Sequence, residues 1–155
     1  MTAPDLKDRA FEDFTVGEVV ETNGRTIEMS DILAFAGLTG DHYPLHTDEE
    51  FARKTRFGGR IAHGPLTFSI AVGQMALSGY YGNAIVALLG CDELRAKAPV
   101  RPGDTVRVRA QVLGADPGEN PKYGTLTLSY SVLNQEDVEV MSFRWVMLAR
   151  RRSAA

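Results

Sequence analysis

The segment that most constrains the fold runs from Leu66 to Leu77 and directly follows Pro65. Proline is favoured at the start of a helix, where its missing N–H is not needed, and Gly79 is a natural stop. Apolar side chains are spread most of the way round this predicted helix, which indicates that it is buried. Such a helix requires other secondary structure to be wrapped around it.

The second half of the chain can provide that covering, because it has the patterns of β-strands. Residues 106–112 and 126–132 alternate between apolar and polar side chains, as expected of strands with one buried face. The continuous apolar run 84–89 predicts a strand covered on both faces, and a last long strand is expected over 138–148. Turns join these segments, so the sheet is predicted to be antiparallel.

Helices are expected mainly before this sheet. One is predicted to begin at Ser30 as its N-cap and to end near Gly37 or Gly40. A short helix is expected after a capping box formed by Thr47 and Glu50. Because helices and strands are segregated along the chain, the predicted fold class is α+β, with an antiparallel sheet wrapped around a central buried helix.

The chain length of 155 residues fits a single domain over 1–155. Its ends, about 1–10 and 150–155, are expected to be flexible. A single open sheet leaves an edge that a second chain can cover, so a homodimer, or a larger assembly, is expected.

Composition argues against several functional classes. The net charge of −3 gives no general attraction to nucleic acid. No apolar run approaches the roughly 20 residues that a membrane-spanning helix needs. The single cysteine, Cys91, lies in an apolar run where it is expected to be buried, and it cannot form an internal disulfide, so a cytoplasmic location is expected.

The residues that carry chemistry are concentrated between Gly40 and His46, in the sequence Gly-Asp-His-Tyr-Pro-Leu-His. Gly40 can adopt the positive φ that ends a helix, and Pro44 disfavours helical geometry at the residue before it. The stretch is predicted to be a short, stiff loop that holds the Asp41 carboxylate and the His46 imidazole between two helices. Such a pair suits general acid–base catalysis, because histidine titrates near neutral pH and a carboxylate can tune it or share its proton.

Each of these residues also has a purely structural interpretation. Asp41 alone could complete a turn at the helix end, and His46 alone could be a packed histidine bonded to backbone. His42 and His46 have the spacing of a zinc site on a helix, but Pro44 interrupts the helix and no cysteine or HExxH pattern accompanies them, so no metal is expected. The glycines form neither a GxGxxG motif nor a P-loop, so no nucleotide cofactor is expected.

Two motifs and their separation resemble a known family. The first is Gly40-Asp41-x-x-Pro44-Leu45-His46, and the second is Ala62-His63-Gly64 at the start of the apolar helix. Together they are similar to the (R)-specific enoyl-CoA hydratases of the MaoC-like family, which have the hot-dog fold. Residues 99–105 also resemble that family's entry into a long strand, so the likeness extends from about residue 26 to the end.

The resemblance implies a lyase that adds water reversibly to a trans-2-enoyl-CoA and gives a (3R)-hydroxyacyl-CoA. In this interpretation Asp41 and His46 activate the water and supply the proton to C2. The backbone N–H of Gly64, at the positive start of the helix, stabilises the thioester oxygen. No cofactor is implied beyond the coenzyme A thioester of the substrate.

Further residues are expected near the substrate. Arg53, Arg56 and Arg60 form a basic cluster that is either a solvated surface or a landing site for the phosphates of coenzyme A. His63 is expected to support the turn into the buried helix, with a role in the site as the alternative. Tyr43 replaces the asparagine that is usual in the family, and its ring is expected to lie along the acyl pocket and to favour short or polar acyl groups.

Two other functions are compatible with the same fold. A thioesterase would direct water at the carbonyl carbon in place of C3. A non-catalytic acyl-CoA-binding domain would result if Tyr43 filled the pocket. The paired Asp41 and His46 favour hydration, since a lone carboxylate near the buried helix would have favoured hydrolysis.

Overall fold

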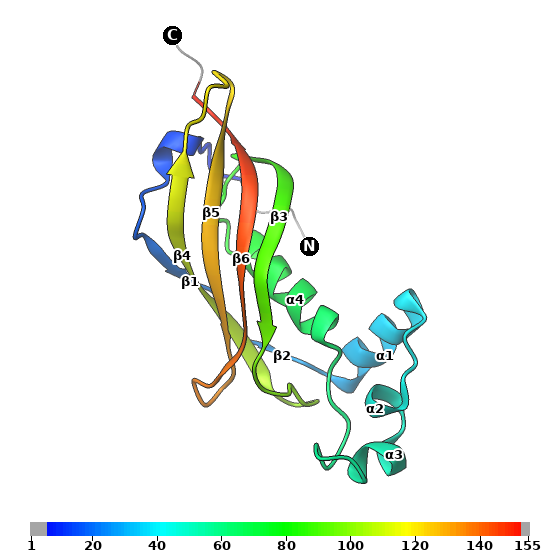
Figure 1. Ribbon diagram of the computed structural model, residues 1–155. Helices are drawn as coiled ribbons and strands as arrows, with labels where there is room; N and C mark the ends of the chain where they lie inside the picture. The colour runs from blue at the N-terminus through cyan, green and yellow to red at the C-terminus, as the bar shows by residue number, and fades with distance from the viewer. Residues whose placement is uncertain (1–5, 153–155) are drawn as a thin grey trace.

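The computed structural model describes residues 6–152 and confirms the predicted architecture (Figure 1). Its central helix, α4 (Gly64–Leu77), lies along one face of an antiparallel sheet. Ile70, Ala71 and Met75 of α4 belong to the buried core that this helix shares with the sheet. Leu77 and its neighbours at the end of the helix remain exposed, so burial covers the sheet-facing side of α4 only.

Six strands form the sheet, in the order β1-β4-β5-β6-β3 with β2 also paired to β4. Buried and partly exposed side chains alternate along β4 and β5, as the apolar–polar pattern predicts. The strands are β1 (Val19–Glu21), β2 (Arg25–Thr26), β3 (Ile85–Ala96), β4 (Thr105–Asp116), β5 (Tyr123–Leu133) and β6 (Glu139–Arg150).

Three short helices gather near the N-terminal end of α4 (Figure 1). They are α1 (Met29–Thr39), α2 (Pro44–Thr47) and α3 (Glu49–Arg53), and a single 3-10 turn, η1 (Phe11–Asp13), precedes the first strand. The prediction of Ser30 as the N-cap of α1 is wrong: Glu28 is the N-cap, and its N–H donates to the Asp31 carboxylate at 2.9 Å. Within residues 6–152, no helix is both long and apolar enough to cross a membrane.

Strand β3 differs from its prediction. It lies at the edge of the sheet and pairs only with β6, and its residues Val86, Leu88 and Leu89 are 49–55% exposed. Cys91, which was expected to be buried, is also exposed. The apolar run predicts a strand covered on both faces, but within residues 6–152 ten of the twelve residues of β3 are exposed.

The described parts of the two chain ends contact each other. Ala10 is only 2% exposed, and the C-terminal arginines pair with acidic residues near the N-terminus. The flexibility of the ends stays a prediction, and residues 1–5 and 153–155 lie outside the described residues. These terminal ion pairs join Arg150 to Asp8, Arg151 to Glu12 and Arg152 to Asp13.

The carboxyl groups of the terminal ion pairs have lowered pKa values. For Asp13 the first cause is the hydrogen bond from the backbone N–H of Ala10, and the positive charge of Arg152 adds to it. A carboxyl group whose pKa is lower in the folded than in the unfolded chain stabilises the fold above its unfolded-state pKa. That stability is lost as the pH falls through the folded-state pKa.

We therefore expect Asp13→Asn to lower the melting temperature at pH 7 by about 2 °C. The difference from the unmodified protein should begin to shrink as the pH falls below 3.8, the ordinary pKa of an aspartate, because Asp13 of the unfolded chain then binds a proton first. It should disappear as the pH falls through the lower pKa of Asp13 in the folded chain. Thermal denaturation followed by circular dichroism between pH 7 and pH 3 measures this difference. Glu119→Gln is the control, because it removes an exposed carboxylate that has no ion pair among residues 6–152; a difference independent of pH would contradict the prediction.

Candidate functional site

The predicted catalytic loop lies between α1 and α3. Helix α1 ends at Gly40, whose φ of 78° is the left-handed conformation that favours glycine. The loop is shorter than predicted, because Pro44 begins the one-turn helix α2 that contains His46. The predicted capping box of Thr47 and Glu50 is replaced by Asp48, whose carboxylate accepts the Phe51 N–H at 3.0 Å and caps α3.

Asp41 lies in the four-residue connection between α1 and α2 and is fixed by its own turn. Its Oδ1 accepts the backbone N–H of Tyr43 at 3.2 Å, and its own N–H donates to the Thr39 hydroxyl at 3.3 Å. The side chain is 49% exposed, so the second carboxylate oxygen remains accessible from outside the loop.

His46 is oriented by one hydrogen bond to the segment before α4. Its Nδ1 lies 2.8 Å from the carbonyl oxygen of Ile61. A carbonyl can only accept, so the proton of the neutral ring is assigned to Nδ1, which leaves a lone pair on Nε2. Nε2 is therefore the nitrogen of His46 that is able to take a proton from a bound molecule.

His63 is buried, with 1% of its surface exposed, and it contacts both predicted catalytic residues. Its Nε2 lies 2.9 Å from the backbone carbonyl oxygen of Asp41, and its ring stacks on that of His46 with a centroid distance of 3.9 Å. The sequence placed His63 at the turn into α4 but gave no sign of these two contacts, since His63 lies far along the chain from both partners.

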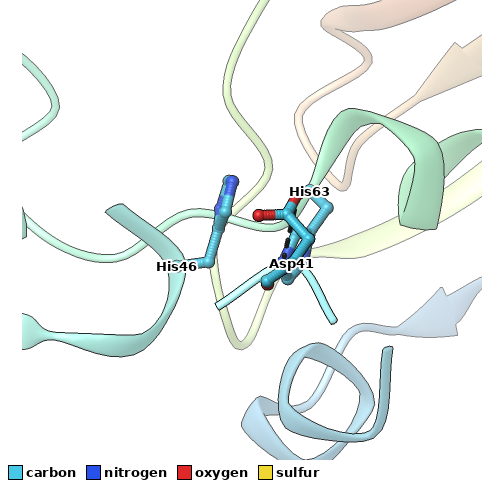
Figure 2. A group of neighbouring side chains, drawn as sticks. All are labelled: Asp41, His46 and His63. Carbon is cyan, nitrogen blue, oxygen red and sulfur yellow. Dashed lines mark hydrogen bonds and ion pairs between the residues drawn. The ribbon is translucent and has the colours of Figure 1, made fainter. Parts of the chain in front are cut away.

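Asp41, His46 and His63 thus form one compact group (Figure 2). One carboxylate oxygen and one ring nitrogen from each histidine lie within 4.8 Å of one another. Transition metals bind such oxygen and nitrogen atoms. The lone pair of an imidazole nitrogen, however, lies in the plane of its ring. Because the two rings are stacked, their lone pairs lie in neighbouring planes and do not point at one common ion. The absence of a metal stays a prediction, which the stacking supports.

Gly64 directly follows His63, and among residues 6–152 its backbone N–H has no hydrogen-bond acceptor. It is the first residue of α4, so its N–H has no acceptor within the helix, and Pro65 at the next position has no N–H. A side chain built at Gly64 would meet no atom within 4 Å, so the space in front of it is open. The N–H therefore offers a partial positive charge to an oxygen bound at the start of α4.

Gly64 also lines a cavity of about 210 Å³. The segment before α4, its first turns and the end of β3 with the following loop form the walls, together with two residues of β6. The β3 and β6 residues carried no local sequence signal, because only the folded sheet brings them to the site. The lining residues are Arg56, Phe57, Ile61, Ala62, Gly64, Thr67, Ala96, Lys97, Ala98, Pro99, Val100, Val140 and Met141.

Residues 12–133 match the protein family described as MaoC like domain, which is most of the chain. The chain belongs to this family. An (R)-specific enoyl-CoA hydratase from Rhodospirillum rubrum is 38% identical to this MaoC-like chain over 141 residues, covering 90% of this chain and 92% of that protein.

Solved structures agree with the family assignment. A MaoC-like dehydratase from Rhodospirillum rubrum has a TM-score of 0.85 and 32% identity, covering 95% of this chain and 100% of that one. A Mycobacterium tuberculosis protein described as having a double hot-dog fold has a TM-score of 0.82 at 23% identity, which shows the fold alone. The hot-dog fold of this MaoC-like chain is confirmed, and the chain covers 46% of that double structure.

The basic cluster of the MaoC-like chain divides into paired and unpaired side chains. Arg53 contacts Glu49 and Glu50 at 3.1 and 3.3 Å, and Arg60 contacts Glu49 at 2.9 Å. The guanidinium carbon of Arg56 lies 4.8 Å from the centroid of the Phe57 ring, and Arg56 also lines the cavity. Among residues 6–152 no carboxylate forms an ion pair with Arg56. Only Arg56 of the three arginines is thus placed at the cavity with its charge uncompensated.

Tyr43 lies beside the predicted catalytic residue His46 but does not line the cavity. Its side chain is 57% exposed, and its ring packs edge-on against His46 and Phe51 with centroid distances of 6.5 and 6.1 Å. In the single chain the ring therefore borders His46 from the outside. Its effect on acyl length stays a prediction.

Proposed function

We propose that this MaoC-like chain is a lyase that adds water reversibly to a trans-2-enoyl-CoA and yields a (3R)-hydroxyacyl-CoA. The observation that carries the proposal is the meeting of Asp41, His46 and His63, because His63 directly precedes Gly64 at the start of α4. Relatives named hydratase and dehydratase, at 38% and 32% identity, support the same reaction type.

Hydration requires a base for water, an acid for C2 and a donor for the thioester oxygen. The lone pair on Nε2 of His46 and the accessible Asp41 oxygen hold a water molecule between them, and one of them takes its proton as the oxygen bonds to C3. The electron pair of the double bond moves toward the thioester carbonyl, whose oxygen becomes negative and accepts the Gly64 N–H. A proton delivered to C2 by the same acid–base pair restores the carbonyl and completes the addition.

The first expectation is that Asp41→Ala and His46→Ala each lower kcat by about 10²–10⁴, the range for loss of a general acid or base. The measurement is the loss of the conjugated double bond of crotonyl-CoA in a spectrophotometer, with release of free thiol recorded in parallel. His42→Ala is the control, since this exposed histidine lies in the same connection but outside the catalytic group.

The parallel thiol measurement distinguishes the competing functions. Free thiol without loss of the double bond would indicate a thioesterase, and neither signal would indicate a binding domain. Hydration that persists unchanged in both alanine variants would contradict the assignment of the site.

The second expectation concerns Arg56, which we propose contacts a phosphate of coenzyme A. Arg56→Gln should raise KM for crotonyl-CoA about tenfold with little change in kcat, as expected when one charge-assisted hydrogen bond to the substrate is lost. Arg53→Gln is the matched control, because the guanidinium of Arg53 is already engaged by two glutamates. Equal effects of the two changes would mean that only general surface charge matters.

The third expectation is a homodimer that pairs through the β3 edge. The exposed apolar residues of this edge strand, and the double hot-dog relative of about twice this length, support it. Light scattering at micromolar concentration should give the mass of two chains, and Leu88→Asp should give that of one. Val16→Asp changes an exposed apolar residue outside β3 and should leave the dimer intact; a monomeric unmodified protein would refute the prediction.

A further inference from the structure

We infer that His63 is a positioning residue: its imidazole ties both catalytic side chains to the rigid start of α4. The inference rests on the proposed function and assigns His63 a task beyond supporting the turn. His63 is the N-cap residue of α4 and directly precedes Gly64, the candidate donor to the thioester oxygen. Whatever holds Asp41 and His46 to His63 therefore also sets their distance from that donor.

The tie to Asp41 is a hydrogen bond between side chain and backbone. Nε2–H of His63 donates to the Asp41 carbonyl oxygen at 2.9 Å. Among the described residues, the other hydrogen bonds of Asp41 stay within its own turn: its N–H donates to the Thr39 hydroxyl at 3.3 Å, and its carboxylate accepts the Tyr43 N–H at 3.2 Å. The bond from His63 is thus the one that fixes this turn relative to α4.

The tie to His46 is the stacking of the two rings. Their planes are 29° apart, with the centroids at 3.9 Å, and the Phe35 ring of α1 lies 5.1 Å from the His63 ring. His63 is therefore in contact with α1, with the Asp41 turn and with α2. The stack fixes the orientation of the His46 ring. Because the proton is on Nδ1, this orientation also sets the direction in which the lone pair on Nε2 points.

Packing alone does not account for a histidine at this position. The Nδ1 atom of His63 is buried and has no hydrogen-bond partner among the described residues, and an unpaired buried acceptor is costly. A phenylalanine ring would fill similar space without that cost. What the histidine provides in addition is the Nε2–H that binds the Asp41 carbonyl.

Three substitutions separate the hydrogen bond from the packing. His63→Gln retains an amide N–H near the Nε2 position but loses the ring, whereas His63→Phe retains a ring that can stack but has no donor. His63→Asn retains the amide on a shorter side chain that cannot reach the carbonyl.

We expect kcat for crotonyl-CoA hydration to fall about 10²-fold in the phenylalanine and asparagine variants, since a displacement of about 1 Å has that effect. The glutamine variant keeps the bond to Asp41 but loses the stack on His46, so its kcat should fall by about tenfold only, and KM should change little in all three.

Amide hydrogen exchange of residues 40–47 gives a second readout that does not depend on activity. Exchange should be faster in the phenylalanine and asparagine variants and close to normal in the glutamine variant. The positioning role is refuted if kcat of the variants falls in step with their melting temperature and not with the loss of the N–H donor. It is also refuted if hydrogen exchange is the same in all of the variants.

An unmodified protein that does not hydrate crotonyl-CoA would refute the proposed function. The exchange pattern alone would then show whether His63 holds residues 40–47 in place. If His63→Phe fails to fold, the comparison of glutamine with asparagine is sufficient.

Discussion

The structure depends above all on the burial of one side of α4 against the sheet. Strands β4, β5 and β6 present their inward side chains to this helix, and the resulting core includes Val108, Leu128 and Met147. Burial of apolar surface is the dominant favourable term in folding, and it requires that the helix and the sheet form together. The position of every other element follows from this contact, since α1, α2 and α3 are attached to the chain that enters α4.

The packing of α4 against the sheet also fixes the position of its first turn, where the candidate site lies. A buried helix cannot move easily relative to its sheet, so its first N–H groups point in a fixed direction. His63 and Gly64 stand at that point, and they bring a side-chain donor and a backbone donor to one place. Asp41 lies in a short connection and His46 in a single helical turn, and hydrogen bonds with residues 61 and 63 hold both of them to the segment that enters α4.

The sequence was sufficient to predict the elements that follow a regular period. The alternation in β4 and β5, the apolar character of α4 and the helix end at Gly40 depend on local chemistry, and each is confirmed. Helix starts were predicted less well, because Asp31 and Asp48 compete with neighbouring polar residues to cap the same turns. The pairing of Asp41 with His46 could be inferred from their proximity in sequence, but the contacts of His63 could not, since they join residues brought together only by the fold.

The misinterpreted strand β3 shows how a pattern can be correct and its explanation wrong. A continuous apolar run indicates cover on both faces, yet within this chain Leu88 and Leu89 are exposed at the sheet edge. Under the proposed dimer, a second chain provides the cover that the pattern indicates. The far end of the same strand contributes Ala96 to the cavity wall beside Gly64. In the proposed dimer, pairing along β3 would bear on the shape of the cavity at Gly64 as well as on the exposed apolar edge, because the same strand contributes to both.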